Sequence, residues 1–409
     1  MTVTSNHVDA QRRTPWEGNP LAEESERWDS IASDVAKELG RDALDRDRAR
    51  RLPDAELALL KESGLADLMI PAEYGGQGGH WGTAVRVVRI LARTDASIAQ
   101  VLSYHYFNQA SIVFFGDQSH WERRFTASAR GHWLWGDSVN PVDPDLTLTP
   151  TEDGGYVLDG IKRFSTGAAT GDVILVMGKV VGQDRVMAVI VSGGQEGITH
   201  IDDWDGLGQR LSVSGSVRFE RVRVTAADVL GEVGDEPYST MVTPGVQLGF
   251  ANLYLGVAEG ALARARELVL GRRGSWFLSG VEHYAHDPFV QRLLGELVSR
   301  TAALEALADR VGADYEAMIG RGGQVTEADR AEVAVAVARL KVVATETAIE
   351  VANRVFEATG SSSARSEIGL DLFWRNVRTH SLHDPVDYKK LEVGASFLNG
   401  TVQPISLYT

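Results

Sequence analysis

The sequence contains no cysteine, which excludes disulfides, thiolate metal sites and a cysteine nucleophile. It also lacks an apolar run long enough for a membrane helix, and residues 1–20 contain no apolar signal segment. Basic residues are few, 41 against 56 acidic ones, for a formal charge of −15. That charge repels phosphate backbones and anionic membrane surfaces, so we expect no nucleic-acid or membrane partner. We expect a cytoplasmic protein that acts on small organic molecules and takes any redox chemistry from a cofactor.

The distribution of apolar residues divides the chain into three parts. Helical spacing runs through residues 22–64 and 81–115, whereas short β-type runs separated by glycine-rich turns fill residues 133–230. The helical period returns from Thr243 onward. With 409 residues and 44% apolar content, each part can bury a core of its own. We therefore predict domains at residues 1–130 (helical), 131–235 (β) and 236–409 (helical).

One C-terminal helix is predicted to be long. Thr326 is followed three residues later by Asp329, a capping-box pattern, and the helical spacing continues to a stop at Gly360. A helix of about 33 residues spans about 50 Å at 1.5 Å per residue. A helix of that length is more than one small domain needs, so we expect it to pack in a bundle and across a subunit interface.

Several segments at the domain joints carry a more specific signal. They are LKESGL at 60–65, IPAEYGGQG at 70–78, GIKRFSTG at 160–167, GLG at 206–208, and residues 356–360 with 375–378. In this order they resemble the acyl-CoA dehydrogenase family over nearly the whole chain. The resemblance implies an α+β fold with an N-terminal helical domain, a central β-barrel-like domain and a C-terminal four-helix bundle.

At a finer level the chain resembles one branch of that fold. Tyr104-His105, Trp204, Asn252–Gly256 and above all FWRNVRTHSLHDP at 373–385 are similar to the flavin-dependent monooxygenases related to dibenzothiophene monooxygenase. The resemblance implies reduced FMN, with FAD possible, delivered by a separate NAD(P)H:flavin reductase. It also implies a C4a-hydroperoxyflavin formed with O2, a small hydrophobic aromatic substrate oxidised at sulfur, as in thiophenes and dibenzothiophenes, and a homotetramer.

The resemblance also suggests the catalytic side chains. His380 and His383 are spaced i, i+3, so both rings can reach one point, and an imidazole has a pKa near working pH. We assign His383 to donate to the peroxide and His380 to support it, with Thr166 against the flavin ring and Tyr104 lining the pocket. A purely structural histidine pair is the alternative. A metal site would need a third ligand, and none is evident, so no metal is expected.

Further residues are implied to hold the flavin, and some depart from the branch. Asp137 stands where asparagine is expected, and Gln100 replaces a histidine, so both change the polarity of the pocket. Arg273 is displaced by one position but remains the candidate for the flavin phosphate, because a guanidinium binds phosphate bidentately. The implied cofactor-binding set is Asp137, Ser138, Thr166, Trp204, Arg273, Gly360 and Arg375.

Three other functions remain open from the sequence. N-hydroxylation of an amine needs the same flavin chemistry. An acyl-CoA dehydrogenase needs a carboxylate base, but the family's positions fall near residues 379–383 and at Val246-Gln247, where no glutamate stands. Asp384 and Asp387 are shorter and shifted. A non-catalytic protein on the same fold is the third reading, because fold does not dictate function.

Overall fold

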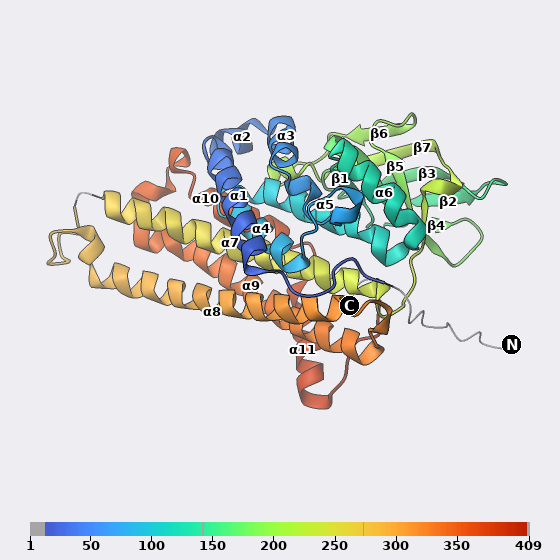
Figure 1. Cartoon of the computed structure of the whole chain (residues 1–409). Coiled ribbons are helices and arrows are strands. Elements are labelled where there is room, and N and C mark those ends of the chain that lie inside the picture. The colour runs from blue at the N-terminus through green and yellow to red at the C-terminus, as the bar shows by residue number, and fades with distance from the viewer. Residues whose placement is uncertain (1–12, 141–142, 273, 407–409) are drawn as a thin grey trace.

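The N-terminal region is helical. The structure is a computed structural model that describes residues 13–140, 143–272 and 274–406. Every residue of one helix, α5, is buried, because it lies between the neighbouring helices and the strands (Figure 1). The helices are α1 (Ala22–Gly40), α2 (Ala43–Ala49), α3 (Asp54–Glu62), α4 (Trp81–Ala92), α5 (Ala96–Phe115) and α6 (Gln118–Gly131).

The helical spacing predicted for residues 22–64 and 81–115 is confirmed, although each stretch is divided into shorter helices. Arg50 ends α2 in the left-handed conformation, with φ 51°, and Pro53 precedes the first turn of α3. The second stretch is broken before α5, where the Asp95 carboxylate accepts hydrogen bonds from the backbone N–H groups of Ser97 and Ile98. Apolar spacing alone does not locate such breaks, whereas Pro53, which lacks a backbone N–H, marks one of them in the sequence.

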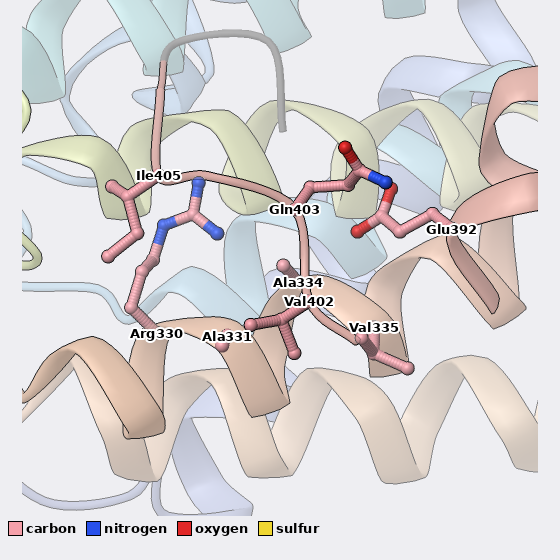
Figure 2. Close-up of a pocket in the computed structure, with 8 residues that line it drawn as sticks. All are labelled: Arg330, Ala331, Ala334, Val335, Glu392, Val402, Gln403 and Ile405. Atoms are coloured by element: carbon pink, nitrogen blue, oxygen red, sulfur yellow. The ribbon is translucent and has the colours of Figure 1, made fainter. Parts of the chain in front are cut away.

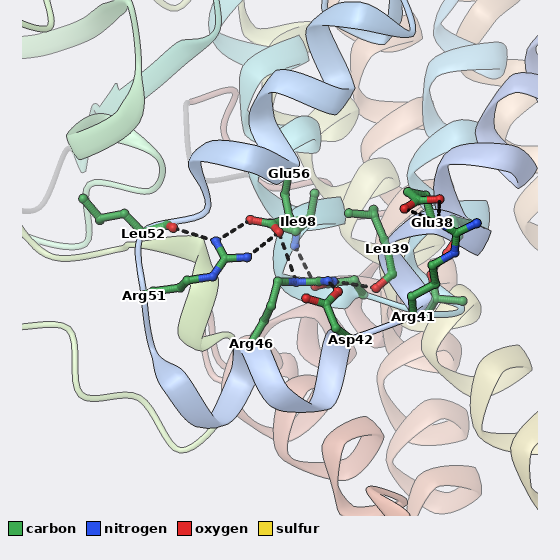
Figure 3. A network of polar contacts seen from close by, with 12 residues as sticks. Glu38, Leu39, Arg41, Asp42, Arg46, Arg51, Leu52, Glu56 and Ile98 are labelled. Carbon is green, nitrogen blue, oxygen red and sulfur yellow. Dashed lines mark hydrogen bonds and ion pairs between the residues drawn. The ribbon is translucent and has the colours of Figure 1, made fainter.

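A buried arginine joins α2, α3 and α5 (Figure 3). The Arg46 guanidinium donates to the Leu39 carbonyl at 2.6 Å and to Asp95 at 2.8 Å, and its Nε lies 3.5 Å from Glu56. Glu56 in turn accepts a bidentate pair from Arg51 at 2.7 and 2.9 Å. We call Leu39, Arg46, Arg51, Glu56 and Asp95 the Arg46 cluster.

The central region is a single eight-stranded sheet with the strand order β6-β7-β3-β2-β4-β5-β8, and β1 pairs in parallel with β4. Its own core contains Leu148, Val176, Val189 and Phe219. The sheet lies at one end of the molecule beside α5 and α6 (Figure 1). The strands are β1 (Trp135–Ser138), β2 (Leu146–Pro150), β3 (Tyr156–Lys162), β4 (Val173–Val180), β5 (Val186–Ser192), β6 (Ile198–Ile201), β7 (Ser216–Val224) and β8 (Val229–Glu232).

The C-terminal region is built on three long helices. The predicted start of the longest, α9, is confirmed, because Asp329 N–H donates to Thr326 Oγ1 at 3.2 Å and Thr326 N–H donates back at 2.9 Å. Its 33 residues and its stop before Gly360 also agree with the prediction. The helices are α7 (Val242–Gly271), α8 (Pro288–Ile319), α9 (Glu327–Thr359), α10 (Asp371–His380) and α11 (Val386–Asn399).

Helix α11 departs from the direction of the three long helices (Figure 1). Its buried residues are a charged pair, Lys389 and Glu392, whereas its large apolar side chains are exposed. The chain then returns over α9, where Val402, Gln403 and Ile405 line a small pocket beside Arg330 (Figure 2). Within the described ranges, no helix combines the length and apolar character that a membrane span needs. The exposed apolar residues of α11 are Tyr388, Leu391, Phe397 and Leu398.

Candidate active site

Tyr104 on α5 lies at the centre of the predicted catalytic residues. Its ring centroid is 6.4 Å from that of His380 and 6.4 Å from that of His383. Burial raises the pKa of its phenol well above the usual value, Asp137 and Asp384 raise it further, and the Thr166 hydroxyl opposes them. The fold therefore brings Tyr104, Thr166 and the two histidines together. With Gln100, we call these five residues the site cluster.

His380 ends α10 and is buried. Its Nδ1 is 2.9 Å from the Tyr254 hydroxyl, and the Phe250 ring packs against it with centroids 4.6 Å apart. Burial lowers the pKa of His380 well below its usual value, and the charges of His383 and Lys341 lower it further, so this imidazole is neutral near pH 7. Its Nε2 atom is buried and has no hydrogen-bond partner among the described residues.

His383 lies in the turn after α10 and is far more accessible. Its side chain is 45% exposed, and its Nδ1 is 3.4 Å from Asp384 Oδ1. Its ring stacks on that of His380 with centroids 5.8 Å apart, as the i, i+3 spacing predicts. The pair thus combines one neutral, buried imidazole with one that is open to solvent.

A buried lysine, missed in the sequence, lies behind His383. Lys341 Nζ donates to Gln247 Oε1 at 2.5 Å and to Asp384 Oδ1 at 2.9 Å, and Gln247 Nε2 donates to Asp384 Oδ2 at 3.3 Å. Burial alone would raise the pKa of Asp384, but the bond from His383 and the Lys341 charge hold it well below its usual range. The signal was available, since Lys341 interrupts an apolar run on α9. A carboxylate so paired is a poor base for a dehydrogenase.

Thr166 lies in the loop after β3, against β1. Its Oγ1 accepts from Gln100 Nε2 at 3.3 Å and is 2.9 Å from Ser214 Oγ. The Thr166 carbonyl accepts from the backbone N–H of Asp137 at 2.9 Å. The Ser138 hydroxyl donates to Ser165 Oγ at 2.8 Å. The two segments predicted to cradle the flavin ring are therefore bonded side by side.

Asp137 is buried beside this loop. Burial raises the pKa of its carboxyl to about 7, against the opposing effects of the Val139 N–H, Asn108 and Lys162. Lys162 is buried as well and donates to the Asn140 carbonyl at 2.7 Å. Asp137 therefore changes charge near neutral pH, which an asparagine at this position cannot do.

Two predicted flavin contacts are engaged within the protein. The indole N–H of Trp204 donates to the Gln209 carbonyl at 2.8 Å. Arg375 donates to Asp47 at 2.7 Å and to the Leu207 carbonyl at 3.0 Å. These bonds hold the loop before β7 against α10 and α2. The flavin-binding roles of Trp204 and Arg375 stay predictions.

The predicted flavin contact Gly360 lies elsewhere. Gly360 follows α9 with φ 75°, and a Cβ on it would come within 2.8 Å of the Arg272 guanidinium. Arg272 directly follows α7, which ends at the extremity of the bundle away from the strands (Figure 1). Arg273 itself lies outside the described residues. Within one chain, Gly360 is thus remote from Thr166.

Around Tyr104, several buried polar atoms lack partners. Such atoms cost about 1–3 kcal/mol each when they stay unpaired, so they are typical of sites that bind a polar group. The residues mix donors with acceptors and are flanked by Tyr104 and Phe250, so they fit a polar aromatic ring such as a flavin. In the part of the chain that the structure describes, these atoms are Gln100 Oε1, Ser103 Oγ and His380 Nε2.

Comparison with known proteins matches both helical regions. Residues 22–132 match the acyl-CoA dehydrogenase N-terminal domain, and residues 248–388 match the acyl-CoA dehydrogenase C-terminal domain. Dibenzothiophene monooxygenase from Rhodococcus qingshengii is 35% identical over 416 residues, covering 98% of each chain. FMN-bound TdsC from Paenibacillus sp. A11-2 has a TM-score of 0.90 at 34% identity, covering 94% of this chain and 100% of that one.

Methanesulfinate monooxygenase MsuC from Pseudomonas fluorescens is similar too, with a TM-score of 0.90 at 33% identity, covering 93% of this chain and 99% of that one. These matches confirm the predicted fold class: an N-terminal helical region, a central β region and a C-terminal helical region. They also confirm the predicted class of enzyme. The chain belongs to the flavin-dependent monooxygenases built on the acyl-CoA dehydrogenase fold.

Proposed function

We propose that this enzyme is a two-component monooxygenase, which takes reduced FMN from a separate NAD(P)H:flavin reductase and uses O2 to oxygenate a small hydrophobic substrate. The observation that carries the proposal is the site cluster, where Thr166, Tyr104, His380 and His383 converge beside buried, unpaired polar atoms. The FMN bound by the similar TdsC supports the choice of cofactor over FAD.

Each residue has a distinct part in this proposal. Bound FMN supplies the oxygen-activating chemistry. Asp137, Ser138 and Thr166 orient the ring from the strand side. Tyr104 and Phe250 exclude water, which strengthens every polar contact in the site. His383 delivers a proton that it can regain from solvent, while the neutral His380 holds that ring by stacking.

We favour sulfur as the oxidised atom and an aromatic thioether or thiophene as the substrate. The similar enzymes are named for sulfur compounds, although these differ greatly in size: dibenzothiophene and methanesulfinate. N-hydroxylation is the second candidate, and one observation favours it. Asp137 places a buried carboxyl where it can accept a hydrogen bond from a substrate N–H.

We also propose a homotetramer in which each flavin contacts two subunits. Gly360, a proposed flavin contact, lies beside Arg272 near the end of the bundle remote from Thr166, so one flavin cannot reach both Gly360 and Thr166 within a chain. The apolar side chains exposed on α11, together with Trp276, Phe277 and Phe289, provide surface for subunit contacts. Light scattering tests this assembly, and a stable monomer that binds flavin would contradict it.

The decisive experiment supplies the enzyme with a flavin reductase, NADH and O2. FMN and FAD are tried in parallel, each with a thiophene series, an amine series and an acyl-CoA. We expect a sulfoxide or sulfone from an aromatic thioether with FMN. Hydroxylamine products alone would favour the second candidate. Desaturation of acyl-CoA, with no oxygenated product from sulfur or nitrogen substrates, would overturn the proposal.

A further inference from the structure

A chain of hydrogen bonds runs from Thr166 into the loop before β7. Thr166 Oγ1 is 2.9 Å from Ser214 Oγ, which is 2.7 Å from Ser212 Oγ. Ser212 Oγ is 2.8 Å from the Gln209 carbonyl oxygen. All three hydroxyl side chains are buried, with at most 4% of each residue exposed. Nothing in the sequence singled out Ser212 or Ser214.

The carbonyl at the end fixes the direction of the whole chain. A carbonyl oxygen cannot donate, so the Ser212 proton must lie between Ser212 Oγ and the Gln209 oxygen. Because each hydroxyl has one proton, Ser214 then donates to Ser212, and Thr166 donates to Ser214. Gln100 Nε2 donates to Thr166 from the other side. With its proton given to Ser214 and one lone pair taken by Gln100, Thr166 has one lone pair left, so it can only accept, either from the neighbouring Tyr104 hydroxyl or from a ligand.

Backbone hydrogen bonds fix the positions of these hydroxyls. Gly167 N–H donates to the Ser212 carbonyl at 3.0 Å, and Ser165 N–H donates to the Gly215 carbonyl at 2.9 Å. Val213, between the two serines, has φ 48°, which a β-branched residue rarely adopts. Such strain persists where the surroundings enforce it and concentrates at functional sites. The loop is therefore fixed in the conformation that turns both serines into the chain.

We propose that Ser214 and Ser212 are positioning residues that make Thr166 a hydrogen-bond acceptor and so select reduced over oxidised FMN. The inference rests on the proposed binding of FMN against Thr166. Reduced flavin carries a hydrogen on N5 and can donate to Thr166, whereas oxidised flavin has a lone pair there and meets another lone pair. An enzyme that takes reduced flavin from a separate reductase gains from such selectivity, because oxidised FMN then competes less for the site.

The experiment measures the dissociation constants of oxidised and reduced FMN anaerobically by fluorescence titration, without turnover. Wild type should bind reduced FMN more tightly. In Ser214→Ala the Thr166 proton is free to turn toward N5, so the ratio of the two constants should fall about tenfold. For a two-electron couple, this makes the potential of bound FMN about 30 mV more negative.

Three further variants serve as checks and as a control for this test. Ser212→Ala breaks the chain one step further on and should shift the ratio in the same direction. Ser214→Thr keeps a hydroxyl and should restore the wild-type ratio. The matched control is Ser216→Ala, because this buried hydroxyl donates to Asp203 Oδ2 at 2.6 Å and not to the chain. Its ratio should equal that of wild type.

The outcomes separate this inference from the proposed function. A wild type that binds neither form of FMN overturns both. If wild type binds FMN but the ratio is the same in Ser214→Ala, Ser212→Ala and Ser216→Ala, the hydrogen-bond direction is overturned while the proposed function stands. A ratio that falls in the first two variants alone supports the inference.

Discussion

Two buried polar clusters, the Arg46 cluster and the site cluster, differ in how completely their atoms are paired. In the Arg46 cluster, opposite charges face one another: the arginine donates to Asp95 and to the Leu39 carbonyl, and its Nε, the one buried side-chain atom of the cluster without a hydrogen bond among the described residues, still lies 3.5 Å from the Glu56 carboxylate. In the site cluster, Gln100 Oε1 and His380 Nε2 are buried with no partner among the described residues. A paired cluster stabilises the fold by itself, whereas an open one is completed by a ligand. The two should therefore respond in opposite ways to the removal of polar groups.

The largest expected effect is in the Arg46 cluster. Arg46→Met leaves Asp95 buried without its cation and leaves Glu56 with Arg51 alone, so the free energy of unfolding should fall by about 3–5 kcal/mol. Urea unfolding followed by circular dichroism measures it. Arg41→Met is the control, because its ion pair with Glu38 is exposed and should contribute less than about 1 kcal/mol. If Arg46→Met lowers the free energy of unfolding no more than the control does, the claim that this cluster stabilises the fold is contradicted.

The second effect concerns Asp137, which is buried beside the Thr166 loop. Removing its charge should stabilise the protein. The pKa of Asp137 is raised to about 7, so the folded state holds the proton where the unfolded state has released it. Wild-type stability should thus fall as pH rises from about 4 to about 7 and then level off. Asp137→Asn does not titrate, so its advantage should grow over that window to about 1–4 kcal/mol.

Unfolding of the flavin-free protein at a series of pH values measures this difference. Asp153→Asn is the control, because hydrogen bonds from Thr151 and Arg223 lower the pKa of Asp153 to about 2. Its difference from wild type should be flat between pH 5 and 8. An Asp137→Asn curve that runs parallel to wild type over this range would show that Asp137 is not desolvated.

Replacement of His383 tests whether the site cluster is catalytic. If its imidazole acts as a proton donor, His383→Ala should lower coupled oxygenation at least about tenfold and raise H2O2 release, since general-acid contributions are commonly 10²- to 10⁴-fold. Affinity for FMN and the melting temperature should stay close to wild type, because the side chain is half exposed. Product, peroxide and melting temperature are measured on one preparation. Unchanged product yield would remove the catalytic role.

The sequence predicted the candidate site through its motifs rather than through its chemistry. The run at 373–385 placed His380 and His383, and the GIKRFSTG segment placed Thr166. Local spacing also predicted the capping box of α9, because a cap depends on residues three apart. These features are local, so one sequence is enough to find them.

What the sequence did not give depends on contacts between distant segments. Lys341 meets Asp384 only because α9 packs beside the end of α10, and Ser214 meets Thr166 across 48 residues. The engagement of Arg375 with Asp47 spans 328 residues. Hydrogen-bond direction likewise requires coordinates, because it follows from which atom faces the Gln209 carbonyl.

The smallest expected effect compares two serines on α5. Ser103 Oγ is buried without a partner among the described residues, whereas Ser111 Oγ donates to the Phe107 carbonyl at 3.1 Å. Both lie in the interior of one helix, so replacement by alanine brings the same gain in helix propensity, about 0.5 kcal/mol. Ser103→Ala also removes an unpaired polar atom, whereas Ser111→Ala removes an existing hydrogen bond that contributes about 1 kcal/mol. Ser103→Ala should therefore exceed Ser111→Ala in free energy of unfolding by about 1 kcal/mol in the flavin-free protein.

Adding reduced FMN should narrow that difference in stability if the ligand pairs with the Ser103 hydroxyl, and paired urea titrations with and without FMN measure it. If Ser103→Ala is instead less stable than Ser111→Ala, the Ser103 hydroxyl already has a hydrogen-bond partner in the flavin-free protein. It is then not available to pair with a ligand.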